Sequence, residues 1–158
     1  MGERSLILYH GTDSKILTPD LTKCNAYRDF GRAFYLSYNK GLARNWAEKK
    51  NRTQAKVNGY GLVLNNVEDG CLKIKRFKAD EKWAKFVYEN RTKEGYVRPD
   101  YDIVIGPIAN DRVGVQLWKY ENCSIDLPTL VRTLRNMRGI TFQYFFGTER
   151  AVKIQKRL

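Results

Sequence analysis

The chain has 158 residues, of which 42% are hydrophobic and 13% aromatic, and it carries a formal net charge of +12. This length and composition indicate one folded domain over residues 1–158 and exclude a disordered chain. No apolar stretch approaches the roughly 20 residues of a membrane-spanning helix, and three widely spaced cysteines favour reduced thiols over disulfides or a zinc site. We therefore expect a cytoplasmic protein that binds neither a membrane nor a metal.

Apolar runs and turn signals predict strands and helices that interleave along the chain. Strands are expected at residues 5–9, at 30–37 after a turn at Gly31, and at 57–64, 71–77, 101–105 and 140–146. Helices are expected at residues 40–50, from Asp80 to about Asn90, and at 127–137 and 148–156. A turn through residues 65–70 is expected to join two of the strands, and Gly106-Pro107 to end another. The strands lack the regular rhythm of a parallel sheet, so the expected fold class is α+β.

The positive charge is concentrated in two segments. Residues 23–56 contain nine Lys and Arg against Asp29 and Glu48, a net charge of +7, and residues 132–158 contain seven against Glu149, a net charge of +6. The rest of the chain therefore carries a net charge of −1. Such segments are typical of proteins that bind nucleic acid, and a charged, solvated face is the alternative.

The single histidine of the chain stands where an apolar strand ends, in Tyr9-His10-Gly11-Thr12. A neutral imidazole offers one hydrogen-bond donor and one acceptor, and a glycine lets a ligand approach the backbone closely. A second short aromatic segment follows at residues 30–37, with the sequence Phe-Gly-Arg-Ala-Phe-Tyr-Leu-Ser. The pair indicates a ligand site, and a histidine in an ordinary turn is the alternative.

These two segments resemble the nicotinamide pocket of the ADP-ribosyltransferase superfamily, of the poly(ADP-ribose) polymerase and diphtheria-toxin type. A longer likeness runs along most of the chain, to a bacterial family long catalogued as a domain of unknown function and grouped with these transferases. The matching blocks, in order, are residues 8–12, 29–36, 43–47, 83–91, 101–111 and 143–151. The resemblance implies the split, two-sheet ADP-ribosyltransferase fold, with NAD as co-substrate.

The resemblance also implies how the two segments would hold NAD. His10 would hydrogen-bond the adenosine ribose, and Thr12 would assist at the ribose hydroxyls. Gly11 would offer its backbone to the nicotinamide amide. Tyr35 would stack on the nicotinamide ring, in a pocket segment that begins at Gly31.

Two further residues each have two interpretations. Arg32 would bind the NAD pyrophosphate in a bidentate manner, or it is only a loop arginine. Trp46 lies near the place where family members often put a second aromatic ring against the nicotinamide. Its helical spacing favours the other interpretation, in which Trp46 packs in the core beneath helix 40–50.

The third catalytic element of the family is a glutamate on a late strand, which binds the ribose 2′-hydroxyl and helps to deprotonate the acceptor. The matching residue here is Gln143, whose amide can hydrogen-bond the 2′-hydroxyl but cannot act as a base. Glu149 is the alternative, although it is expected in the first turn of the last helix, where the helix dipole favours a carboxylate. Asp111 is a further candidate for the missing carboxylate. Many relatives have a histidine where this chain has Gly147.

The resemblance and the charge pattern together predict a mono-ADP-ribosyltransferase, acting as a toxin of a toxin–antitoxin or anti-phage defence system. The expected acceptor is nucleic acid, RNA more than duplex DNA, and the expected partner is an antitoxin protein. One alternative is an enzyme that modifies a host protein or simply hydrolyses NAD. The other is a non-catalytic nucleic-acid or nucleotide-binding module with a decayed site.

Overall fold

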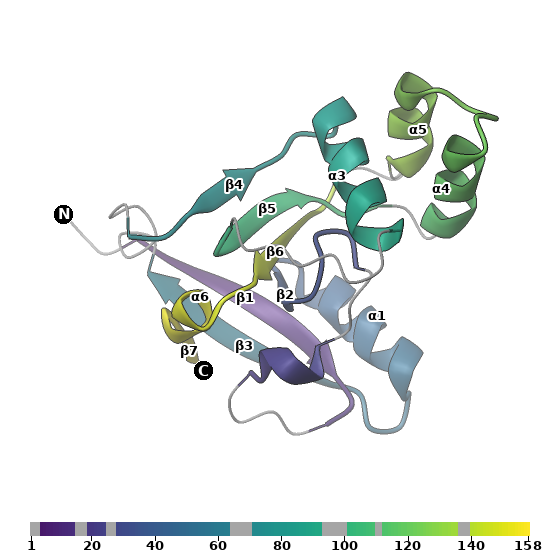
Figure 1. The fold of residues 1–158 in the computed structure, drawn as a ribbon. Helices are drawn as coiled ribbons and strands as arrows, with labels where there is room; N and C mark the ends of the chain where they lie inside the picture. The colour runs from purple at the N-terminus through teal and green to yellow at the C-terminus, as the bar shows by residue number, and fades with distance from the viewer. Residues whose placement is uncertain are drawn as a thin grey trace.

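The structure is a computed structural model that describes residues 4–14, 19–24, 28–63, 71–92, 101–109, 112–135 and 140–158. Over these residues the fold is mixed α+β in a single domain, as the sequence predicts, with five α-helices around one curled seven-stranded sheet (Figure 1). The strands are β1 (Ser5–Thr12), β2 (Phe34–Ser37), β3 (Lys56–Val63), β4 (Ile74–Arg76), β5 (Ile103–Pro107), β6 (Phe142–Phe146) and β7 (Gln155–Arg157). Their order across the sheet is β4-β5-β6-β2-β1-β3-β7.

The sheet has a weak join between β1 and β2. β1 pairs with β3 along eight residues, from Ser5 to Thr12, whereas its register with β2 contains only the pair Tyr9 and Ser37. On one side of this join lie β1, β3 and β7, and on the other lie β2, β6, β5 and β4. The resemblance implies two separate sheets, but the described strands form one continuous sheet with this short seam between its two parts.

Each face of the sheet carries its own hydrophobic core. Leu8, Phe34 and Phe146 belong to one core, together with Ala151 of α6 (Glu149–Lys153). Successive side chains of a strand point to opposite faces of the sheet, so Phe145, which precedes Phe146 in β6, belongs to the other core. Helix α6 lies in front of the sheet in Figure 1 and α1 (Lys40–Lys50) behind it.

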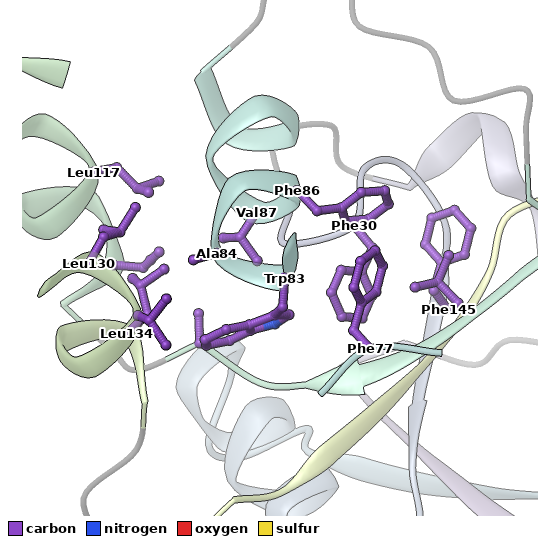
Figure 2. Close-up of a cluster of buried hydrophobic side chains, with 14 of the residues drawn as sticks. Phe30, Phe77, Trp83, Ala84, Phe86, Val87, Leu117, Leu130, Leu134 and Phe145 are labelled. Carbon is purple, nitrogen blue, oxygen red and sulfur yellow. The ribbon is translucent and has the colours of Figure 1, made fainter. Parts of the chain in front are cut away.

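The second core is built around α3 (Glu81–Thr92), which begins where the Asp80 side chain accepts a hydrogen bond from the Trp83 backbone. Figure 2 shows α3 between leucines of two other helices and a group of phenylalanines that includes Phe30. Those two helices are α4 (Val113–Glu121) and α5 (Leu127–Leu134). The Trp83 indole donates to the Pro107 carbonyl at 3.0 Å, so this core is tied to β5. Among the described helices none is long and apolar enough to cross a membrane.

Most elements fall where the sequence predicts them, and five differences have physical causes. The strand expected at residues 5–9 continues to Thr12, because His10 and Gly11 still pair with Asn58 and Val57 of β3, so they lie within β1 and do not end it. β3 and β4 are not neighbours, because β3 pairs with β1 and β7 while β4 pairs with β5. Gly106 and Pro107 extend β5 instead of ending it, since both have register partners in β6. The predicted helix 148–156 ends at Lys153, and the chain then pairs with β3 as β7. Helix α4 was not predicted, because its valines and Gly114 are weak helix formers. The predicted turn at residues 65–70 lies outside the described residues.

Gly11 provides a direct test of how α1 rests on the sheet. A Cβ atom at Gly11 would lie 1.8 Å from the Ala43 carbonyl oxygen of α1, so Gly11→Ala must push the helix away. We expect it to lower the free energy of unfolding by about 3 kcal/mol, in the range of an overpacked core. Gly114→Ala is the matched control, since a Cβ there meets nothing within 4 Å in α4, and it should stabilise by about 0.5–1 kcal/mol. Equal urea midpoints for the two variants would contradict this account of the contact.

Candidate active site

His10 is fixed in one orientation at the seam between β1 and β2. Its Nδ1 lies 2.9 Å from the backbone carbonyl oxygen of Tyr35. A carbonyl oxygen only accepts hydrogen bonds, so Nδ1 carries the proton and Nε2 is left as an acceptor. The ring also rests on Phe34, with the ring centroids 4.2 Å apart. The side chain therefore takes the place of the ladder hydrogen bonds that β1 and β2 lack beyond their single register pair.

The environment of His10 keeps the imidazole neutral. Burial lowers its pKa to about 4, with a smaller contribution in the same direction from the charge of Lys50, against the hydrogen bond to the Tyr35 carbonyl. At neutral pH the ring is thus uncharged, and Nε2 offers a lone pair. This is the hydrogen-bonding character that a hydroxyl group of a ligand requires.

Tyr35 uses its hydroxyl to hold the preceding turn. The hydroxyl donates to the Gly31 carbonyl at 2.6 Å and accepts from the Phe30 backbone at 3.0 Å. Burial, with a contribution from nearby Asp29, raises the pKa of Tyr35 well above its ordinary value. Gly31 has a φ of 97°, which favours glycine. Since the hydroxyl is committed to this turn, Tyr35 can act on a ligand only through its ring.

Gln143 is part of a buried hydrogen-bond network. Its Nε2 donates to Asp29 Oδ2 at 2.8 Å, and the Ala109 backbone donates to the same oxygen at 3.1 Å. Arg91 of α3 donates its Nε to the other oxygen, Oδ1, at 2.7 Å, and its guanidinium forms an ion pair with the carboxylate. Asp29 and Gln143 are both buried. The network joins the loop before β2, the end of α3 and the start of β6.

Three of the sequence-predicted residues share one face of the sheet. Gln143 stands opposite Ser37 in β2, and Ser37 stands opposite Tyr9 in β1. Because residues two apart on a strand point to the same face, Tyr35 and Gly11 lie on the face that carries Gln143. The three strands are adjacent in the sheet, so the structure brings these residues together from three distant parts of the sequence. His10 alternates with Gly11 on β1, and its ring rests on Phe34 on the opposite face, so His10 meets this group only through its hydrogen bond to the Tyr35 backbone.

Trp46 does not pack in the core as its helical spacing favours. The buried residues of α1 are Ala43 and Ala47, whose small side chains let the helix approach Gly11. Trp46 is only half-buried and belongs to neither hydrophobic core. Part of the Trp46 side chain therefore stays exposed to solvent.

Two cations, Arg32 and Lys50, lie near Cys24. Burial and Asp20 raise the pKa of the Cys24 thiol, while the charges of Arg32 and Lys50 both oppose that shift. Lys50 also acts on His10. Arg32 is exposed and donates to the Thr22 carbonyl at 3.4 Å. Both cationic side chains are exposed to solvent, where they can meet an anion.

The remaining candidates have other surroundings. Thr12 is buried, and its hydroxyl accepts a hydrogen bond from the Ser14 backbone at 3.2 Å, which closes the turn after β1. Glu149 is exposed in the first turn of α6, where the sequence places it. A Cβ atom at Gly147 would lie 2.3 Å from the Phe145 ring, so glycine suits that position. Asp111 lies outside the described residues.

Sequence reasoning gave no role to Asp29, Arg91 or Lys50. Asp29 and Arg91 lie within blocks of the family pattern, and Asp29 is one of only two acidic residues in the basic segment 23–56. That isolation was the available signal, but a contact between residues 62 positions apart cannot be read from a single sequence. Lys50 gave no signal, because it follows another lysine on an exposed helix end.

Comparison with known proteins gives one result. A family model described as "Protein of unknown function (DUF3990)" matches residues 6–156. Neither the curated proteins nor the solved structures contain a match to the chain.

The lowered pKa of His10 predicts how stability depends on pH. Between pH 6.5 and about 4 the unfolded chain takes up a proton that folded His10 resists, so the contribution of His10 to stability is complete above pH 6.5 and is lost as the pH falls through this window. From pH 7 to pH 5 the wild type should lose about 2 kcal/mol more unfolding free energy than His10→Asn. Urea unfolding of both proteins measures the difference. Burial raises the pKa of Asp102, but its hydrogen bonds lower it more, so both proteins also lose stability in acid through Asp102. This loss is the same in both proteins and cancels in the comparison. An NMR titration midpoint near 6.5 for this single histidine would contradict the prediction.

Proposed function

The chain belongs to the DUF3990 family of proteins of unknown function, and we propose that it is a mono-ADP-ribosyltransferase that uses NAD to modify nucleic acid, RNA in preference to duplex DNA. The observation that carries the proposal is the hydrogen bond from His10 Nδ1 to the Tyr35 carbonyl. It presents a neutral acceptor, Nε2, at the seam of the sheet. Gly11, Tyr35 and Gln143 lie on three adjacent strands on the other face of this seam.

The polar groups of the site suit the parts of NAD. His10 Nε2 would accept a hydrogen bond from a hydroxyl of the adenosine ribose. Arg32 and Lys50, both near Cys24, would face the pyrophosphate. Tyr35 and the half-buried Trp46 supply aromatic rings for the nicotinamide, beside the backbone of Gly11.

The chemistry asks little of the protein beyond positioning. The bond between nicotinamide and ribose breaks with its electron pair on the ring nitrogen, so nicotinamide leaves neutral and needs no general acid. Positive charge develops on the ribose meanwhile, and the Gln143 carbonyl would stabilise it by accepting a hydrogen bond from the 2′-hydroxyl. A lone pair of the acceptor then bonds to the ribose C1′, and the acceptor proton passes to solvent, because an amide is no base.

Charge next to the site favours a nucleic-acid acceptor. Six exposed basic residues lie on α1 and just beyond it, and we call them the α1 basic surface: Lys40, Arg44, Lys49, Lys50, Arg52 and Lys56. Helix α1 rests directly on Gly11, so this surface borders the site. A phosphate backbone bound there would bring bases to the reacting ribose. A glutamine in the third position also fits a nucleophile that needs no strong base better than it fits a protein guanidinium.

An enzyme of this kind would harm the cell that makes it, and we propose a toxin of a toxin–antitoxin or anti-phage defence system. The three widely spaced cysteines, Cys24, Cys71 and Cys123, suit action in the reducing cytoplasm. An antitoxin protein would neutralise the enzyme by covering the site or the α1 basic surface.

Labelled NAD separates the proposed acceptor from the alternatives. Purified protein incubated with adenylate-labelled NAD and cell extract should transfer label that ribonuclease removes and protease does not. His10→Ala and Tyr35→Ala should abolish the transfer. Label that only protease removes would make the acceptor a protein, and nicotinamide release without any label would indicate an NAD glycohydrolase. Salt-dependent RNA binding without nicotinamide release would indicate a binding module.

Trp46 should contribute to NAD binding through its ring. We expect Trp46→Ala to raise the KM for NAD about 3–10-fold, the effect of losing one aromatic contact. Trp118→Ala is the matched control, because Trp118 is 60% exposed on α4, and its KM should match that of the wild type. An unchanged KM in Trp46→Ala would remove this residue from the site.

A further inference from the structure

We propose that Asp29 is a positioning residue that fixes which way the Gln143 amide points, and that Asp29 is the reason a glutamine occupies this position. The consequence for catalysis rests on the proposed function. The geometry rests only on hydrogen bonds among the described residues.

The Asp29 carboxylate receives donors on both of its oxygens. Arg91 Nε donates to Oδ1 at 2.7 Å, and Gln143 Nε2 and the Ala109 backbone donate to Oδ2 at 2.8 and 3.1 Å. A carboxylate paired with an arginine only accepts hydrogen bonds. Gln143 must therefore turn its NH₂ group toward Asp29, and its carbonyl oxygen must point the other way. The ambiguity between the two ends of an amide is resolved by the charge of its neighbour.

This orientation matters for the reacting ribose. A carbonyl oxygen accepts a hydrogen bond from the 2′-hydroxyl, which leaves electron density on the sugar as positive charge develops. The opposite orientation would direct an NH₂ donor at the same hydroxyl and withdraw electron density. Asp29 thus determines whether Gln143 assists or opposes the breaking of the bond to nicotinamide.

The same contact excludes a glutamate in β6. The substitution Gln143→Glu would bring a second carboxylate to the place of the amide nitrogen, 2.8 Å from Asp29 Oδ2 in a buried site. Two carboxylates at this distance repel each other unless they share a proton. When Asp29→Asn is added, however, the introduced amide can donate its NH₂ group to the introduced carboxylate and keep its oxygen toward Arg91, although the hydrogen bond from the Ala109 backbone is lost. The second oxygen of that carboxylate would then restore an acceptor for the 2′-hydroxyl.

Asp102 offers a matched control elsewhere in the fold. It too is buried, and it accepts hydrogen bonds from an arginine (Arg150, 2.9 Å), a backbone amide (Lys73, 2.8 Å) and a side chain (Thr148, 2.6 Å). It lies just before β5, whereas Ala109 and Gln143 lie at the opposite end of the β5–β6 pair. Asp102→Asn therefore disturbs an equivalent network without touching Gln143.

The first readout is thermal unfolding of Asp29→Asn, Gln143→Glu and the double variant. Gln143→Glu should lower Tm by about 10 °C, the order expected for an uncompensated buried charge. Adding Asp29→Asn should recover at least half of that loss. A double variant no more stable than Gln143→Glu would overturn the proposal, and this result does not depend on activity.

The second readout compares NAD with an analogue lacking the 2′-hydroxyl on the nicotinamide ribose. Asp29→Asn should lower kcat for NAD about 100-fold and change kcat for the analogue less than about 3-fold. Asp102→Asn should leave the ratio of kcat for NAD to kcat for the analogue unchanged. The double variant should have a higher kcat for NAD than either Asp29→Asn or Gln143→Glu. An equal loss on both substrates in Asp29→Asn would reduce Asp29 to a structural role. A wild type that neither binds nor cleaves NAD would refute the proposed function, and the Tm values alone would then decide the Asp29–Gln143 pairing.

Discussion

The short join between β1 and β2 is the constraint on which the rest of the site depends. A single register pair connects the two parts of the sheet there, and the His10 side chain supplies a further hydrogen bond across the gap. A sheet that ran in full register would use the backbone groups at this place for pairing and leave no room for a ligand. The incomplete pairing keeps polar backbone near Gly11 next to a neutral imidazole and an aromatic ring. Helix α1 can cover that region closely only because Gly11 has no side chain.

Two buried aspartates secure the two ends of the β5–β6 pair, and Asp29 is the one that contacts Gln143. Asp29 and Asp102 each take hydrogen bonds from an arginine, a backbone amide and a side chain, and they secure the opposite ends of the β5–β6 pair. Buried charges of this kind are costly unless they are paired and hydrogen-bonded. Here the partners come from α3, from α6 and from the segments that flank the two strands, so the strand that carries Gln143 is held at each end. The orientation of the Gln143 amide follows from its hydrogen bond to Asp29.

The sequence predicted local features well and long-range ones poorly. Helix 40–50, the Asp80 cap and the strand at Tyr35 follow from short-range periodicity and capping, which a single sequence contains. The positions of β3 and β4 in the sheet do not, because strand order depends on which surfaces become buried together. Trp46 has helical core spacing, but two alanines fill the space beneath α1. For the candidate site, motifs and the family resemblance predicted His10, Tyr35 and Gln143, whereas the contact between Asp29 and Arg91 exists only in the folded chain.

The place of β6 in the sheet has a consequence for how the chain folds during synthesis. β6 lies between β2 and β5, yet it follows every strand except β7 in the sequence. Until residues 142–146 have left the ribosome, β2 and β5 lack the neighbour that joins them, and contacts between such distant segments form slowly. Gln143 arrives with β6, so the growing chain has no assembled site. For the toxin proposed above, this order delays activity until translation has passed β6, and it leaves the unpaired edges of β2 and β5 accessible to a protein that binds the nascent chain.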